Sequence, residues 1–342
     1  MRLRVSILVL ALSLVIGSEP GRAQTPIPPD LRAIDQSWAM ELSAPPLPGT
    51  IRFTPPPETS IANDAFGLMV KRGIAIFTDT PAQAKPYANN GLTCANCHLD
   101  RGRRAGSTPM WAAWVTYPRF RSKNDRVNTM AMRIQGCFRF SMNGTPPPDD
   151  GEIMAALQSY FFWLATGAPT GAKLEGAGFP ALAEPAEAPS IVRGSAVFAA
   201  NCAACHGADG QGRRAPGLQR YQFPPLWGAN SYNWGAGMES VEVAARFIHA
   251  NMPWGLKDAL SLQEAWDVAM FLNSHERPQD PRFTGDLAET RAPLSQQQMV
   301  ALRHESERRP ARRSRELPAR SAVAIVPPPA FSPSPAGQRP AL

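Results

Sequence analysis

Apolar residues recur at helical spacing in the first half of the chain. They predict one helix at about residues 64–76 and a second at about residues 127–138. A third predicted helix begins at Asp149, where the spacing of Asp149 and Glu152 is typical of a capping box. The intervening segments have the Gly, Pro and Asn content of irregular loops. This half of the chain therefore predicts a small helical domain.

The same order of elements recurs in the second half. A predicted helix that contains Ile191 and Phe198 ends near residue 202, and another covers residues 240–251. Ser261 and Glu264 predict a capping box for the last helix. Repetition of helix, loop and further helices predicts an all-α fold in which two small domains follow each other.

Composition places the boundaries between these units. Residues 24–170 form the first predicted domain, and a proline-rich stretch at 24–60 is expected to lie over it as an extended arm. A Gly-, Ala- and Pro-rich linker is predicted at 171–188, and the second domain covers 189–283. Each domain is long enough to bury a core of its own.

The first residues have the pattern of a secretory signal. Arg2 and Arg4 precede an apolar run at 7–16, which is too short to span a bilayer well, and a small residue precedes a plausible cleavage point after residue 23. An uncleaved anchor is the alternative. The pattern predicts a signal peptide at 1–23, a periplasmic mature protein and no stable membrane span after its removal.

The net charge of +7 is unevenly distributed. The segment 286–342 holds nine arginines against five acids, and its few apolar residues predict that 284–342 is a disordered tail. An electrostatic docking tail is the alternative. The folded part is nearly neutral overall, which argues against a nucleic-acid partner, but residues 100–139 hold nine Lys or Arg and two acids.

The pentapeptide Cys-x-x-Cys-His occurs twice in the chain. Its two thiols match the two vinyl groups of one porphyrin, and the imidazole that follows can reach the iron. Zinc is the alternative, but it needs a second ligand pair nearby and neither motif has one. The motifs predict two covalently bound haem c groups. The attachment and proximal residues are Cys94, Cys97, His98, Cys202, Cys205 and His206.

The second haem needs a distal ligand, for which three residues are candidates. Met252 lies just after a predicted helix and before a proline that ends it, so its thioether can turn inward. Met238 competes from a glycine-rich loop, and His249 precedes Met252 by one helical turn. Met252 is the favoured ligand, because Met/His ligation raises the reduction potential and suits an exit site for electrons.

One cysteine remains after the two motifs are accounted for. Cys137 is either a small buried hydrophobe or a ligand of the first haem. Arg126, Arg133 and Arg139 lie near it in the sequence, and positive neighbours favour the thiolate that binds iron or acts as a nucleophile. Methionines could ligate instead, and composition does not decide between these ligands. They are Met110, Met130, Met132, Met142 and Met154.

From about residue 61 to 282 the chain resembles the dihaem thiosulfate dehydrogenases. The segments that carry the resemblance are Gly91-Leu-Thr-Cys-Ala-Asn-Cys-His98, Tyr117-Pro-Arg-Phe-Arg121, Arg133-Ile-Gln-Gly-Cys137, Ser141-Met-Asn-Gly144, Phe223-Pro-Pro-Leu-Trp-Gly228, Asn251-Met-Pro253 and Glu264-Ala-Trp-Asp-Val268. Every c-type cytochrome shares the haem motif, whereas the context from Cys137 to Gly144 is far more specific.

The resemblance implies a role for several residues. It makes His98 and Cys137 the ligands of the first haem, with Cys137 also catalytic, and His206 and Met252 the ligands of the second. It places Arg133 and Ser141 where substrate is held. Lys123 is a further catalytic candidate, although Lys123 and Phe140 both stand where the family pattern leads us to expect arginine. At position 123 the charge is kept but the bidentate fork is lost, whereas Phe140 removes a charge outright.

The resemblance implies that the enzyme oxidises two thiosulfates to tetrathionate and passes electrons to a periplasmic cytochrome c, copper protein or similar acceptor. The reverse reaction would use the same residues. Two alternatives remain open at this point. The chain could be a dihaem electron shuttle without a substrate, or a sulfur-oxidation subunit that joins thiosulfate to a carrier protein.

Overall fold

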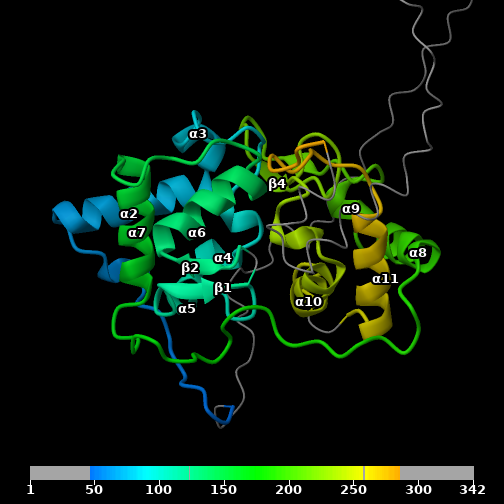
Figure 1. Cartoon of the computed structure of the whole chain (residues 1–342), viewed down its shortest axis with the longest axis horizontal. Helices are drawn as coiled ribbons and strands as arrows, with labels where there is room; N and C mark the ends of the chain where they lie inside the picture. The colour runs from blue at the N-terminus through cyan, green and yellow to red at the C-terminus, as the bar shows by residue number, and fades with distance from the viewer. Residues whose placement is uncertain (1–46, 123, 257–258, 286–342) are drawn as a thin grey trace, which may run out of the picture.

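The computed structural model describes residues 47–122, 124–256 and 259–285, which form two helical bodies side by side (Figure 1). The helices of the first body are α2 (Ala65–Thr78), α3 (Thr80–Gln83), α4 (Leu99–Gly102), α5 (Met110–Trp114), α6 (Met130–Gly136) and α7 (Glu152–Leu164). Those of the second are α8 (Ile191–Asn201), α9 (Ala203–His206), α10 (Val241–Asn251) and α11 (Leu262–Asn273). The all-α prediction is therefore confirmed.

Two short antiparallel hairpins are added to this helical framework. In the first body, β1 (Arg119–Arg121) pairs with β2 (Arg126–Asn128), with Phe120 opposite Val127. In the second, β3 (Arg213–Arg214) pairs with β4 (Tyr221–Phe223) around an irregularity in the register. The first hairpin occupies the start of the helix predicted at 127–138, so α6 begins only at Met130.

The first body is organised by the close crossing of α2 and α7 (Figure 1). The Asp64 side chain caps α2 by accepting a hydrogen bond from the backbone nitrogen of Gly67 at 2.7 Å. At the crossing, a Cβ on Gly73 would overlap the carbonyl of Ala156. Glycine at this position therefore allows the two backbones to approach each other.

The second body repeats this arrangement with α8 and α11. A Cβ on Gly194 would overlap the carbonyl of Asp267. The carboxylate of Asp267 also accepts from the backbone nitrogen of Ser190 at 2.7 Å and pairs with Arg193 at 2.6 Å, which fixes the start of α8 on α11. The tandem repeat predicted from the sequence thus extends to the glycine at the helix crossing.

The predicted helix caps are confirmed in part. The hydroxyl of Ser261 and the carboxylate of Glu264 form the expected capping box at the start of α11. At α7 the prediction is wrong, because the N-cap is Gly151 and no side chain caps the helix. The backbone nitrogen of Gly151 instead donates to the carbonyl of Pro148, so the preceding proline segment ends in a turn that includes Asp149.

The described part of the proline-rich arm lies over the first body, as predicted. The guanidinium of Arg103 donates to the carbonyls of Pro55 and Pro56, and Ile51 forms an isolated bridge with Leu174. The predicted linker has no regular helix or strand, yet it packs closely. Phe179, for example, contacts Phe247 with ring centroids 5.5 Å apart.

The two bodies also exchange side chains across their boundary. Tyr221 and Tyr232, from the second half of the chain, pack in the hydrophobic core of the first body, whereas Leu99 is buried in the core of the second. The side chain of Asn251 donates to the carbonyl of Gly106 at 3.1 Å. The boundary is therefore a packed interface that brings the two cysteine motifs onto one continuous framework.

Several sequence predictions fall outside the described residues. They are the signal peptide at 1–23, Lys123 and nearly all of the tail at 284–342. Within the ranges that the structure covers, no helix has both the length and the apolar character needed to cross a membrane.

Candidate functional site

The first Cys-x-x-Cys-His motif is held in one compact turn. Cys94 opens the short turn η2 (Cys94–Asn96), and the side chain of Asn96 closes it by accepting from the backbone nitrogen of Thr93 at 2.8 Å. Nδ1 of His98 lies 2.9 Å from the carbonyl of Thr108, which leaves Nε2 available to a metal. Burial lowers the pKa of His98 to about 4, so the imidazole is held in the neutral form that ligates iron.

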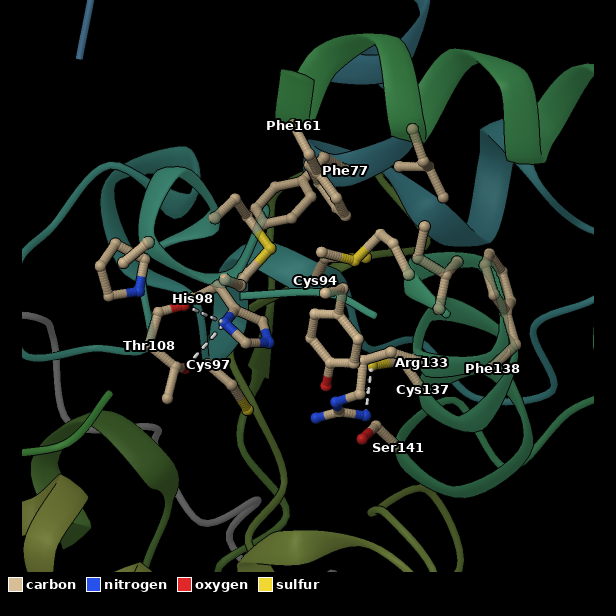
Figure 2. Close-up of a pocket in the computed structure, with 18 of the residues that line it drawn as sticks. Phe77, Cys94, Cys97, His98, Thr108, Arg133, Cys137, Phe138, Ser141 and Phe161 are labelled. Atoms are coloured by element: carbon tan, nitrogen blue, oxygen red, sulfur yellow. Dashed lines mark hydrogen bonds between the residues drawn. The ribbon is translucent and has the colours of Figure 1, made fainter. Parts of the chain in front are cut away.

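The motif lines a large cavity in the first body (Figure 2). The cavity has a volume of about 240 Å³ and is partly open to solvent. Its walls are largely apolar and aromatic, whereas the two thiols and the imidazole lie together on one side. Apolar residues in the walls include Phe77, Leu92, Ile134, Phe138, Leu157 and Phe161.

Cys137 faces the same cavity from a different element. It begins η3 (Cys137–Ser141), a single π-helical turn that continues α6. Nη1 of Arg133 donates to its Sγ at 3.1 Å, and Figure 2 shows both side chains within the cavity. The charge of Cys137 contributes to the raised pKa values of Cys94 and Cys97, after the larger effect of burial. The structure therefore brings Cys137 and the first motif together.

Only some of the methionines considered as alternatives to Cys137 line the cavity. Met110, Met130 and Met142 line the cavity, whereas Met132 and Met154 do not. Met154 is fully buried in the core. Cys137 differs from the three cavity methionines in that a guanidinium touches its sulfur, as expected for a thiolate.

The predicted cationic stretch supplies three arginines to the cavity. Arg119 and Arg121 enter from the hairpin and Arg133 from α6, whereas Arg126 and Arg139 are not among the lining residues. Arg121 donates to the hydroxyl of Tyr117 at 2.8 Å. Cys137 and, to a lesser extent, Tyr117 raise the pKa of Arg133, so this guanidinium stays charged beside the sulfur.

Ser141 and Phe140 are neighbours in η3 but have different surroundings. Ser141 lines the cavity, and its carbonyl accepts from the side chain of Asn90 at 3.0 Å. Phe140 is not part of the lining. Its ring lies 4.6 Å from the guanidinium carbon of Arg282 and against Gly235 at the boundary between the bodies. Phe140 is therefore a contact with the second body, and its effect on cavity charge is indirect.

The second motif repeats the proximal half of the first. Cys202 precedes α9, whose last residue is His206, and Nδ1 of His206 lies 2.8 Å from the carbonyl of Pro224. The imidazole is buried, and this burial lowers its pKa. Nε2 is again left available to a metal.

The candidate distal ligands of the second motif lie in different places. Met252 immediately follows α10 and packs in the same hydrophobic core as Cys202. Met238 belongs to the turn η4 (Gly237–Glu239) and contacts that core, but it also lines the cavity of the first motif. His249 is a partly buried residue in the last turn of α10. This placement favours Met252 on the second side and puts Met238 between the two sites.

Sequence reasoning missed the groups that orient the imidazoles. The acceptors are backbone carbonyls, of Thr108 and Pro224, which leave no side-chain signature. It also missed that Tyr232 lines the cavity of the first motif although it lies far along the chain. Tyr117, by contrast, could have been noticed, because it stands beside the arginines of the hairpin in sequence.

The residues at both motifs fit a haem c. Each site combines two thiols for thioether bonds with an imidazole whose Nδ1 is engaged by a carbonyl. At the first site, Sγ of Cys137 also lies in the wall of the largely apolar cavity, where it could hold an iron from the distal side. His/Cys and His/Met sets are both known to hold haem iron, with different reduction potentials.

Comparisons with known proteins agree with this division into two haem domains. Residues 83–170 match the family described as "SoxA/TsdA, cytochrome c domain", and residues 191–276 match the family described as "Cytochrome c". The chain is similar to a thiosulfate dehydrogenase of Thiomonas intermedia (strain K12), with 54% identity over 241 residues that cover 70% of this chain and 76% of the relative. It is 50% identical to one of Stutzerimonas stutzeri (strain A1501), over 71% of this chain and 79% of the relative.

A solved structure gives the same result for the fold. The thiosulfate dehydrogenase (TsdBA) of Marichromatium purpuratum, in its as-isolated form, matches with a TM-score of 0.68 and 52% identity. The match covers 71% of this chain but 53% of the solved chain, so this protein corresponds to about half of that longer one. With two cytochrome c domains and extensive identity over most of the curated relatives, the chain belongs to the thiosulfate dehydrogenase family.

Proposed function

We propose that this enzyme oxidises two thiosulfate anions to one tetrathionate at the cavity of the first motif. The observation that carries the proposal is Sγ of Cys137, which faces the cavity with a guanidinium nitrogen of Arg133 at 3.1 Å. A sulfur atom held in this way is both a soft iron ligand and a nucleophile toward another sulfur. The names of the curated relatives support thiosulfate as the substrate.

The proposed chemistry proceeds through Cys137. Its thiolate forms a sulfur–sulfur bond with the outer sulfur of one thiosulfate, and this step releases two electrons. A second thiosulfate then attacks the sulfur that came from the first. The bond to Cys137 breaks, tetrathionate leaves and the thiolate is regenerated. The sum is two thiosulfates converted to one tetrathionate and two electrons, with no net change at the protein.

The arginines of the cavity supply positive charge for two anionic substrates. Two dianions must approach each other, and their repulsion is reduced by cations in a partly dry site. Arg119, Arg121 and Arg133 all line the cavity, and Arg133 lies beside the reacting sulfur. Ser141 lines the same space and can donate a hydroxyl proton to a substrate oxygen. Lys123, which lies between Arg121 and Arg126 in the sequence, remains a candidate contact for the substrate.

We further propose two haem c groups per chain. In this assignment His98 and Cys137 ligate the first iron, and His206 and Met252 ligate the second. The haems supply two one-electron acceptors, of which the thiolate-ligated one has the lower potential. The chain's contribution is to keep both imidazoles neutral and oriented and to place Met252 in the core of the exit domain.

The signal pattern of the first residues supports export, so we place the mature enzyme in the periplasm. A haem held by His206 and Met252 would pass the two electrons on to a cytochrome c, a copper protein or a similar acceptor. The shared boundary between the bodies supports this route, because Tyr232 and Met238 of the second half line the cavity of the first.

The proposal is tested with the purified, haem-loaded protein and a chemical oxidant. The expected result is one tetrathionate and two reduced equivalents of oxidant for every two thiosulfates consumed. A haem-loaded protein that reduces no oxidant with thiosulfate, and yet exchanges electrons with redox proteins, would instead be an electron shuttle. Formation of a thiosulfate adduct on an added carrier protein would favour the carrier-protein alternative.

A further inference from the structure

Arg277 is a buried cation that the proposed reaction does not use. It follows α11 at the end of the second body, and the residue is 6% exposed. Its Nη2 donates to the carbonyl of Leu272 at 3.0 Å. Its Nε and Nη1 are buried without a hydrogen-bond partner, and no described carboxylate forms an ion pair with it. A buried guanidinium without a counter-charge is costly, so this site calls for an anion.

Two aromatic rings pack against the guanidinium of Arg277. The guanidinium carbon lies 4.3 Å from the ring centroid of Tyr232 and 4.9 Å from that of Trp234. Trp234 is 7% exposed, and its indole Nε1 is also buried without a partner. Buried N–H donors without a partner therefore occur on two residues that contact each other, Arg277 and Trp234. The Tyr232 hydroxyl is also a neighbour of the Arg277 guanidinium, whose charge opposes the rise that burial causes in the pKa of Tyr232.

Arg277 and Trp234 lie close to the cavity of the first motif. Tyr232 packs against Arg277 on one side and lines the cavity of the first motif on the other. Figure 1 shows the segment after α11 running back toward β4, at the boundary between the bodies. The unpaired donors thus belong to the second body but lie beside the first site.

We propose that Arg277 and Trp234 form a carboxylate-binding site for a propionate of the first haem. The propionates are the anionic groups of a haem, and a guanidinium next to an indole N–H provides charge and hydrogen bonds to such a carboxylate. The site depends on the haem assignment made above and not on thiosulfate chemistry. Its consequence is that the second domain adjusts the reduction potential of the haem in the first.

The test is a spectroelectrochemical titration of the haem-loaded Arg277→Gln variant over a range of pH. Without the guanidinium, the carboxylate beside the first haem loses its counter-charge and favours the ferric state. We expect the lower of the two potentials to fall and to gain a dependence on pH in the acid range, because the carboxylate now takes up a proton on reduction. Arg277→Lys keeps the charge and should recover most of the potential.

Arg246→Gln is the matched control, because it removes an arginine of the same domain that is paired with Glu242 at 2.8 Å on α10. Its two potentials should equal those of the wild type.

A second experiment adds chloride or sulfate to the wild type at constant ionic strength, and neither should change the lower potential. An anion-dependent potential would mean that a free ion occupies the site, which overturns the proposal. Unchanged potentials in haem-loaded Arg277→Gln would overturn it as well. If Arg277→Gln does not fold, Trp234→Phe takes its place. This variant removes one N–H donor but keeps the charge, so the lower potential should fall by less than is expected for Arg277→Gln.

Discussion

The two haem domains share their proximal half and differ in their distal half. Both use a glycine at the helix crossing, Gly73 or Gly194, and both engage the histidine Nδ1 with a backbone carbonyl. The first site then has Cys137 with an arginine on its sulfur and a large cavity. The second has Met252 packed in a hydrophobic core. The same helical scaffold thus carries an open, charged distal side in the first domain and a closed, apolar one in the second.

This difference indicates where reactivity is added to an electron-transfer fold. Attachment and proximal ligation are set by local turns and need no access to solvent. A reactive site additionally needs space for substrate, cations and a nucleophile on the distal side. In the first domain, the cations and the sulfur come from the segment that runs from the β1–β2 hairpin through the π turn η3, whereas the space is lined by residues from across the first body. π turns are often found at functional sites, and here the turn begins at the cysteine itself.

The largest expected effect is that of removing the distal sulfur from the first site. Cys137→Gly should reduce the turnover of thiosulfate by about 10⁴-fold or more, because the proposed nucleophile and the proposed iron ligand are lost together. Both haems should remain attached, since Cys137 is not part of either motif. The first potential should rise as the electron-donating thiolate disappears. A pyridine haemochrome assay and a tetrathionate assay measure both results, and retained turnover would reduce Cys137 to a structural residue.

A smaller effect is expected from Arg133. The structure sharpens the prediction here, because this guanidinium contacts the sulfur as well as the cavity. Arg133→Ala should lower kcat/KM for thiosulfate by about 10²-fold, as for the loss of one charge-stabilising donor. The first potential should fall, since a hydrogen bond that withdraws charge from the thiolate is removed. A rise in this potential would contradict the assigned contact.

Met252 provides the corresponding test in the second domain. Met252→Gly should lower the higher of the two potentials and slow electron delivery to the acceptor, while the lower potential stays near its wild-type value. Met238→Gly is the matched control, since Met238 lines the first cavity. If Met238→Gly shifts the higher potential and Met252→Gly does not, the two methionines have been assigned the wrong way round.

The glycines at the two helix crossings test the shared half of the comparison. Gly73→Ala and Gly194→Ala should each reduce the free energy of unfolding by about 1–3 kcal/mol, because an added Cβ meets a backbone carbonyl in both. Denaturant titration followed at the haem absorbance of each domain measures this loss. A large loss in one domain and none in the other would show that the two crossings are not equivalent.

The smallest functional effect is expected at Phe140. Because its ring packs on Gly235 and Arg282 outside the cavity, Phe140→Ala should leave the KM for thiosulfate near the wild-type value. It should cost about 1 kcal/mol of stability through the lost cation–π contact. A large change in KM with unchanged stability would place Phe140 among the groups that act on substrate.

The parts of the molecule that depend on local sequence were predictable. The cysteine motifs, the cap of α11 and the repeat of helices follow from residue spacing alone. The late start of α6 was not predictable, because residues with a helical pattern pair as the strands β1 and β2 instead. Asp149 failed as a cap because the turn from Pro148 to Gly151 competes with it.

Contacts that join distant segments account for the rest of what the sequence did not reveal. Tyr232 lines a cavity whose cysteines lie far earlier in the chain, and Phe140 turns toward the second domain rather than the cavity beside it. The contact between Arg133 and Cys137 could be anticipated, since residues four apart share a helix face. The functional role of this contact depends on the cavity that both residues line, and the sequence alone does not show that cavity.

The assignment of Cys137 to the first iron is tested most directly by electron paramagnetic resonance of the oxidised, haem-loaded protein. The wild type should show a low-spin signal of thiolate-ligated ferric haem next to a second, distinct haem signal. The thiolate signal should vanish in Cys137→Gly and persist in Met252→Gly. A wild-type spectrum without a thiolate signal, or one that Cys137→Gly leaves unchanged, would contradict the distal cysteine on which the comparison of the two domains rests.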